Sequence, residues 1–172
     1  MFKKILVALD SSDMGKQVFQ QALSLAKLTS ANLMLLHVLS PDEDGIPDVM
    51  LLSQMDYYPG WGDDSMKRYL QKLEVHKNQG LQMLQAFCAQ ANIENINTEF
   101  TQNVGSPGRV ICHFAKDWNA DLIVIGRRGL SGITELLIGS VSNYVLHHAP
   151  CSVHILHLPV SYSIAETEIT QE

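Results

Sequence analysis

The sequence predicts an α/β fold, a doubly wound, Rossmann-like domain with a five-stranded parallel sheet and helices on both faces. Three short runs, at 5–9, 33–36 and 122–125, are continuously apolar, which is typical of strands buried on both faces. Segments with apolar residues at three- and four-residue spacing separate these runs, so strands and helices alternate. A chain of 172 residues suits one such domain.

In the first half of the chain, the strand at 5–9 leads to a helix whose apolar residues recur between 18 and 26. Ser12 is the expected N-cap of this helix, because its hydroxyl oxygen can accept from a free backbone N–H. After the strand at 33–36, a long helix is expected over 65–91. Gly80 weakens this helix without having to break it.

In the second half, residues 95–102 alternate and are polar on one face, which predicts a strand at the edge of the sheet. Ser106 and Pro107 mark a helix start, with the serine as cap and the proline in the first helical position. The strand at 122–125 is followed by a glycine-rich loop, a short helix over 140–148 and a last strand over 152–158.

Two segments fall outside this core, so the domain is expected to span 1–158. Residues 40–64 contain seven acidic side chains and no lysine or arginine, and we expect a mobile acidic loop. Its aromatic residues could form a lid or a contact surface, or pack against the body of the domain. The polar segment 159–172 is expected to be a flexible C-terminal tail.

Charge and composition exclude several classes of partner and location. The net charge of −6 argues against nucleic acid as the main partner, because phosphate-backbone binding needs a basic face. No stretch reaches the roughly 18 apolar residues of a membrane span, and the apolar run at the N-terminus is too short for a signal peptide. Three widely spaced cysteines indicate reduced thiols, and we expect a cytoplasmic protein.

The segment GRRGLSGITELLIGS, residues 126–140, carries the clearest functional signal. It follows the most apolar strand and precedes a helix, and glycine lets backbone N–H groups approach an anion closely. Gly139 and Ser140 open that helix, whose free N–H groups and positive dipole end favour phosphate. Arg127 and Arg128 add positive charge. The segment therefore predicts a phosphate cradle.

The alternative is that these glycines only form a loop. A Gly-x2-Gly-x9-Gly-Ser/Thr pattern arises by chance in roughly one chain of this length in a hundred or fewer, and its place between strand and helix favours the cradle. The Walker Gly-Lys-Ser/Thr pattern and the Rossmann glycine fingerprint are both absent from the sequence.

With these features the chain resembles the universal stress protein family. The resemblance covers roughly residues 1–158 and rests on VALDSSD after the first strand, the glycine spacing, and GSVSNYVLHHAPCSVHIL at the end. The glycine spacing matches the ATP-binding subclass of that family. The resemblance implies an ATP-binding protein (or one that binds ADP or AMP), with Mg²⁺ accompanying ATP, and a homodimer formed through the last strand at 152–158.

The resemblance also implies binding roles for particular residues. Asp10 would face the ribose and phosphates, Ala8 and Leu9 would line the adenine pocket, and Val38 would meet the adenine edge through its backbone. The ribose and phosphates would be surrounded by Gly126, Arg128, Gly129, Gly139, Ser140 and Val141. The family often has a small residue where Arg127 stands, so the phosphate contact here could differ.

Several of these residues allow a plainer interpretation. An acid at a strand end, such as Asp10, often caps the following turn, and one carboxylate is thin evidence for a metal. The seven histidines form no convincing metal or catalytic pattern, although His37 adjoins Val38 near the expected pocket. The cysteines are expected to be small core residues.

The favoured function is regulatory: a stress-response protein that binds adenine nucleotide and signals to a protein partner. No catalytic residue is assigned, and at most slow ATP hydrolysis is expected. The alternatives are a nucleotide-dependent enzyme, such as a nucleotidyl transferase, and a flavin-binding protein on a related fold. The sequence lacks the His-x-Gly-His and Ser-Gly-Gly-x-Asp-Ser signatures of such enzymes.

Overall fold

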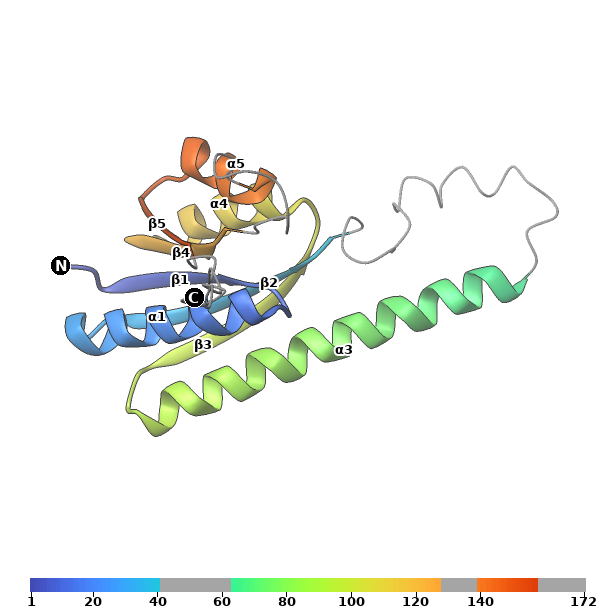
Figure 1. Cartoon of the computed structure of the whole chain (residues 1–172), viewed down its shortest axis with the longest axis horizontal. Coiled ribbons are helices and arrows are strands. Elements are labelled where there is room, and N and C mark those ends of the chain that lie inside the picture. The colour runs from blue at the N-terminus through green and yellow to red at the C-terminus, as the bar shows by residue number, and fades with distance from the viewer. Residues whose placement is uncertain (41–62, 128–138, 158–172) are drawn as a thin grey trace, which may run out of the picture.

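The five strands of the sheet run parallel in the order β3-β2-β1-β4-β5, in a computed structural model that describes residues 1–40, 63–127 and 139–157 (Figure 1). The strands are β1 Lys4–Leu9, β2 Asn32–Leu39, β3 Thr98–Val104, β4 Leu122–Gly126 and β5 Ser152–Leu156. The chain moves outward from β1 to β3, returns to the other side of β1 for β4, and ends at β5. The strand order therefore reverses between β1 and β4.

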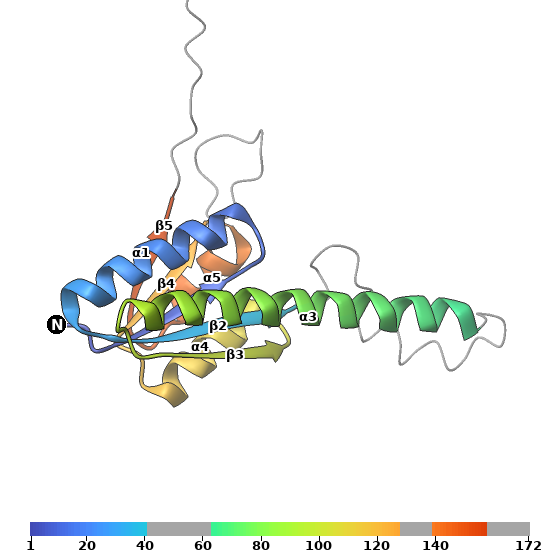
Figure 2. The ribbon, with the colours of Figure 1, turned by 90° about the horizontal axis from the view of Figure 1, so that it is seen from below.

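Helices cover both faces of the sheet, as the doubly wound prediction requires (Figures 1 and 2). The helices are α1 Asp13–Thr29, α3 Asp63–Ile93, α4 Pro107–Trp118 and α5 Ser140–His148. Side chains of α1 and α3 share one hydrophobic core with the sheet, and side chains of α4 and α5 share another. The predicted α/β class, the five parallel strands and the two helical layers are confirmed.

Strand β1 shows why the predicted strands are apolar along their whole length. Ile5, Val7 and Leu9 pack into the core beneath α1 and α3. Leu6 points the other way, into the core beneath α4 and α5. Because alternate side chains enter two different cores, every position of this strand from Ile5 to Leu9 is apolar.

Helix α3 runs past the end of the sheet. It has 31 residues, so it is about 46 Å long at 1.5 Å per residue. Its C-terminal half lies on the sheet, where Leu84 is fully buried, whereas the half that begins at Asp63 extends away from it (Figures 1 and 2). Leu70 and Val75, on the extended half, are about half exposed. The helix is longer than the predicted 65–91 and continues through Gly80.

Other details of the prediction also differ from the structure; for example, β5 ends at Leu156 rather than at 158. Ser106 stands at the N-cap of α4, but its side chain makes no capping hydrogen bond; by contrast the Ser12 hydroxyl accepts from the Gly15 N–H. The edge strand β3 starts at Thr98 rather than at 95, because Asn95 adopts a left-handed turn with φ of 59°. Its position at the sheet edge is as predicted.

The expected acidic loop and the C-terminal tail lie almost wholly outside the described residues, as does most of the glycine-rich loop. Within the part of the chain that is described, none of the helices combines the length and apolar character needed to cross a membrane.

Candidate functional site

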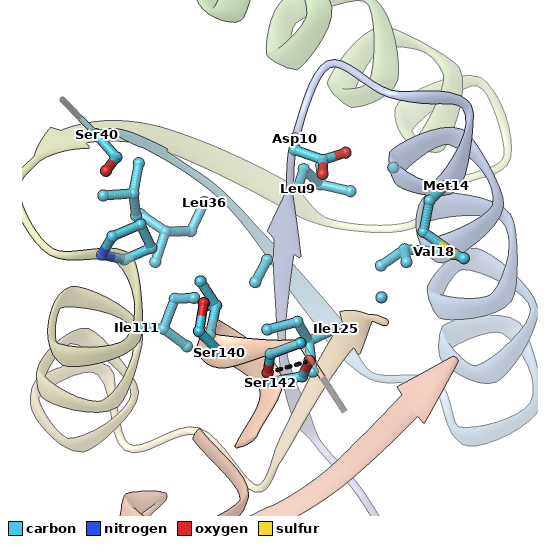
Figure 3. Close-up of a pocket in the computed structure, with 17 residues that line it drawn as sticks. Leu9, Asp10, Met14, Val18, Leu36, Ser40, Ile111, Ile125, Ser140 and Ser142 are labelled. Carbon is cyan, nitrogen blue, oxygen red and sulfur yellow. Dashed lines mark hydrogen bonds between the residues drawn. The ribbon is translucent and has the colours of Figure 1, made fainter. Parts of the chain in front are cut away.

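A pocket opens at the carboxyl ends of β1, β2 and β4, beside the point where the strand order reverses (Figure 3). Ligands in open α/β sheets bind at this location. The pocket is lined by Ala8, Leu9, Asp10, Met14, Gly15, Val18, Leu36, Val38, Ser40, Pro107, Ile111, Ile125, Gly126, Gly139, Ser140, Val141 and Ser142.

The lining combines a broad apolar wall with a few polar groups, the usual composition of a small-molecule site. Leu36 and Val38 from β2, with Ile111 from α4 and Ile125 from β4, belong to the core on the α4 side. Hydroxyl and carboxylate groups stand around this wall, at Ser40, Asp10 and Ser140 (Figure 3). The pocket can therefore take a flat apolar group and several polar ones at once.

Asp10 is the ionisable side chain among the lining residues. Its Oδ1 accepts from the Ser12 backbone N–H at 3.1 Å and from the Ser12 hydroxyl. The same hydroxyl accepts from the Gly15 N–H at 3.3 Å, in the first turn of α1. Asp10 therefore stabilises the turn into α1 while its side chain also borders the pocket, so the capping interpretation and the pocket location both hold.

Glycines bring α1 close to the strand ends that form the pocket. A Cβ on Gly15 would lie 2.1 Å from the Asp10 carbonyl oxygen, which is closer than any real contact. A Cβ on Gly126, at the end of β4, would lie 2.6 Å from Cγ of Met14. Gly126 therefore has a packing role against α1 as well as its place in the predicted phosphate segment.

Helix α5 begins at the pocket. Gly139 is its N-cap, with an extended backbone conformation, and Ser140 is its first residue. The Asn143 N–H donates to the Gly139 carbonyl at 2.9 Å, and the buried Ser142 hydroxyl donates to the same oxygen at 3.2 Å. The backbone N–H groups of the first residues have no carbonyl partner within the helix, a feature that favours anions at this end.

The structure brings most of the predicted binding residues into this one pocket. Those that line it are Ala8, Leu9, Asp10, Val38, Gly126, Gly139, Ser140 and Val141. Arg128 and Gly129 lie outside the described residues. The predicted residues that are described come from β1, β2, β4 and α5, segments far apart in the sequence.

Sequence reasoning missed the other lining residues. They are Met14, Gly15, Val18, Leu36, Ser40, Pro107, Ile111, Ile125 and Ser142. Most of them belong to helices and strands that the sequence did identify. Leu36 could have been predicted, because residues two apart in a strand face the same side and Val38 was already placed at the pocket.

His37, which sequence reasoning placed near the pocket, does not line it. Its neighbours Leu36 and Val38 point to the α4 side, so His37 points to the opposite face, where it contacts Gln102 and Gly80. Among the described residues, no three histidine, cysteine or acidic side chains gather as a metal site would require.

The fold and the pocket define a Rossmann-like α/β domain with a pocket at its topological switch point. The sequence profile of the universal stress protein family matches residues 1–157. The chain belongs to this family.

One relative is the universal stress protein Sll1388 from Synechocystis sp.. It is 36% identical over 159 residues, which span 90% of this chain and 97% of the relative. A second, YxiE from Bacillus subtilis, is 33% identical and covers 91% of this chain and 99% of its own length.

Solved structures share the fold at lower identity. The hypothetical protein MJ0577 has a TM-score of 0.66 at 21% identity, over 94% of this chain and 99% of its own. A universal stress protein in complex with cAMP has a TM-score of 0.58 at 20% identity, covering 91% and 97%. The universal stress protein from Archaeoglobus fulgidus in complex with dAMP has a TM-score of 0.56 at 21% identity, covering 90% and 97%.

Proposed function

We propose that this universal stress protein binds an adenine nucleotide, ATP or its products ADP and AMP, in the pocket at the switch point. The proposed role is regulation in a stress response through binding. One observation carries the proposal. The predicted binding residues that lie within the described part of the chain all line one pocket, next to the N-terminus of α5, where Gly139 is the N-cap.

The chemistry of the residues that line the pocket supports binding of an adenine nucleotide. The apolar side chains of Leu36, Val38 and Ile111 offer a surface for a flat base. Gly139 and Ser140, at the N-terminus of α5, offer backbone N–H groups and a positive dipole end for phosphates. Two structural relatives bind adenine nucleotides, cAMP in one and dAMP in the other, which adds support from the family.

In this proposal Asp10 accepts from the ribose hydroxyls and lies toward the phosphates. Mg²⁺ would arrive bound to ATP, because a single lining carboxylate is too few ligands to hold the ion alone. Arg128 and Gly129 complete the phosphate contacts on the glycine-rich side. These two assignments rest on the resemblance of the segment 126–140 to the ATP-binding subclass of the family.

We further propose that any ATP hydrolysis is slow. Hydrolysis of ATP needs charge stabilisation at the phosphates and a group that positions water. The sequence carries neither the Walker lysine nor the signatures of nucleotidyl transferases.

The cytoplasm remains the proposed location, supported by three cysteines that are all unpaired. A homodimer through β5 is proposed as well, since β5 is the last strand of the sheet and offers an edge for pairing.

The direct test is mass spectrometry of the small molecules released when the purified protein is denatured, combined with calorimetric titration of the ligand-free protein. We expect ATP, ADP or AMP to be released and to bind again with one site per chain. A yellow protein that releases flavin would support the flavin-binding alternative instead. Rapid turnover of ATP by the pure protein would support the enzyme alternative. Absence of both ligand and binding would contradict the proposal.

A further inference from the structure

A buried histidine lies on the face of the sheet opposite the pocket wall, where α3 crosses it. His37 on β2 is 4% exposed, and Gln102 is its partner in the register of β2 with β3. Their side chains meet beneath Gly80 of α3, which is the point where the helix passes from the sheet toward solvent. On one side of this point Leu84 is fully buried, and on the other Val75 is 52% exposed.

The hydrogen bonds at this point determine the protonation state of His37. The amide nitrogen of Gln102 donates to Nδ1 of His37 at 2.9 Å and to the backbone carbonyl of Lys77 at 3.2 Å. An amide nitrogen only donates, so Nδ1 must be an unprotonated acceptor, and the proton of the neutral ring is on Nε2. Turning the amide over would bring its oxygen against the Lys77 carbonyl, which also only accepts. The arrangement is therefore formed with a neutral His37.

Gly80 places the backbone of α3 directly on this pair. A Cβ at Gly80 would lie 2.3 Å from Nε2 of Gln102 and 2.7 Å from Nδ1 of His37. Glycine in a helix costs about 1 kcal/mol relative to alanine, and here it allows Gln102 to reach a carbonyl of the helix. The contact thus joins β2, β3 and α3 through one side-chain amide.

The charges near His37 leave its neutral form favoured. Burial lowers the pKa of His37 below its ordinary value, and the negative charge of Asp10, at the end of the neighbouring strand, acts in the opposite direction. On α3 the nearby titratable groups are Lys77, an exposed cation, and His76, whose Nδ1 is hydrogen-bonded to the Lys72 carbonyl.

Within the described part of the chain, the remaining elements on this face bring few other charges. On β3, Glu99 lies an odd number of residues from Gln102 and so faces the other side of the sheet. On α1, Asp13 and Lys16 form an ion pair with each other at the surface, at 2.8 Å.

We propose that the contact of His37, Gln102 and Gly80 is a pH-sensitive switch, in which neutral His37 holds α3 on the sheet and protonated His37 releases the turns of α3 around Gly80. A protonated Nδ1 would point an N–H at the donating amide of Gln102, and both hydrogen bonds of the amide could not persist together. The exposed half of α3 would then lose its anchor at the sheet edge.

The direction of the pH effect follows from the lowered pKa. The released state binds the proton at about the ordinary pKa of 6.5, and the docked state binds it only at lower pH. Docking is therefore fully favoured above about pH 6.5 and weakens as the pH falls through the window between the two pKa values.

The test is amide hydrogen exchange of the full chain, measured by NMR between pH 7.5 and 5.5. Each rate is expressed as a protection factor relative to the unstructured rate at the same pH, which removes the intrinsic pH dependence. We expect the protection of α3 amides around Gly80 to fall at the lower pH, by at most about tenfold, because a single proton is bound. Amides of α4, on the other face of the sheet, should keep their protection.

Two matched histidine variants separate the switch from general acid effects. His37→Gln supplies an amide oxygen that can accept from Gln102 but does not titrate, so its α3 protection should be the same at both pH values. His76→Gln, on the same helix, should behave as the wild type. An equal loss of α3 protection in His37→Gln and wild type, or no loss in wild type, would overturn the proposal.

A measurement on the unmodified protein covers the case in which His37→Gln does not fold. Nitrogen chemical shifts of the His37 ring distinguish the two neutral tautomers and give its pKa directly. We expect the proton on Nε2 and a pKa below that of the exposed histidines. A neutral ring protonated at Nδ1, or an ordinary pKa, would contradict the switch.

Discussion

Gly15 and Asp10 are in such close contact that the first turn of α1 rests on the end of β1 with no space for a side chain. A Cβ on Gly15 would lie 2.1 Å from the Asp10 carbonyl oxygen and 2.9 Å from Oδ1 of its carboxylate. The obstructing atoms include the backbone itself, which a side-chain rotation cannot move. The position of Asp10 at the pocket therefore depends on the glycine five residues later.

The first prediction concerns Gly15→Ala. The added methyl group should push α1 from the strand end and destabilise the protein by about 1–3 kcal/mol, despite the higher helix propensity of alanine. It should also weaken binding of ATP, because Asp10 moves. Urea unfolding and calorimetric titration measure the two effects. Gln17→Ala, at an exposed position of the same helix, is the control and should change the free energy of unfolding by no more than about 0.5 kcal/mol. If Gly15→Ala is as stable as the wild type, the close contact between Gly15 and Asp10 is contradicted.

A second prediction tests the contact between Gly126 and α1. A methyl group at 126 would lie 2.6 Å from Cγ of Met14 and 3.0 Å from Cγ2 of Val18. Gly126→Ala should therefore cost about 1–3 kcal/mol of unfolding free energy. Adding Met14→Ala should recover part of this loss, because the space that Met14 occupies becomes free. A double-mutant cycle should give a coupling of about 0.5–3 kcal/mol, and strict additivity would show that the two residues do not press on each other.

These two glycines also show what sequence reasoning could and could not find. Gly126 was predicted from its spacing to Gly139, whereas Gly15 lies in a helical pattern where nothing in the sequence distinguishes it. A close approach between a helix and a strand end is a tertiary contact, and a local pattern does not report it. Gly80 is a third example. In the sequence it only weakens the predicted helix, whereas in the structure it lies against His37 and Gln102.

The strands, and the edge position of one of them, could be predicted from the sequence. The continuously apolar runs predicted the three central strands because each enters a core on both faces, as Ile5 and Leu6 do. The alternating pattern of the edge strand β3 was equally informative. The face of a single residue was harder to assign: His37 was placed near the pocket because it precedes Val38, although the two-residue period of a strand sends neighbours to opposite faces.

The third prediction concerns the charge of Asp10. In Asp10→Asn the amide oxygen can still accept from the Ser12 N–H and hydroxyl, so stability should change by less than about 1 kcal/mol. Loss of the charged acceptor for the ribose should weaken ATP binding roughly tenfold. The same substitution removes the negative charge that opposes the effect of burial on His37, so the pKa of His37 should fall further. Calorimetry and an NMR titration measure the two results, and unchanged ATP affinity would remove Asp10 from the binding site.

The fourth prediction concerns Gly129, in the glycine-rich segment outside the described residues. Gly129→Val should block the close approach of the backbone to the phosphates and abolish ATP binding, with the unfolding free energy nearly unchanged. Gly132→Val is the matched control, because Gly132 is in the same segment but not in the Gly-x2-Gly-x9-Gly-Ser spacing. Equal ATP affinity of both variants and the wild type would refute the phosphate cradle.

The fifth prediction concerns the outer edge of β5, which among the described strands pairs with β4 alone, through contacts such as Ile155 with Ile125. If two copies associate through this edge, Ile155→Pro should shift the dimer to a monomer, because proline lacks the N–H that strand pairing uses. Ile155→Thr keeps the N–H and the branched side chain, so it should remain dimeric. Sedimentation equilibrium gives the mass, and circular dichroism checks that the proline variant keeps its fold. A monomeric wild type would exclude the dimer, and a folded, dimeric proline variant would mean that the copies meet at another surface.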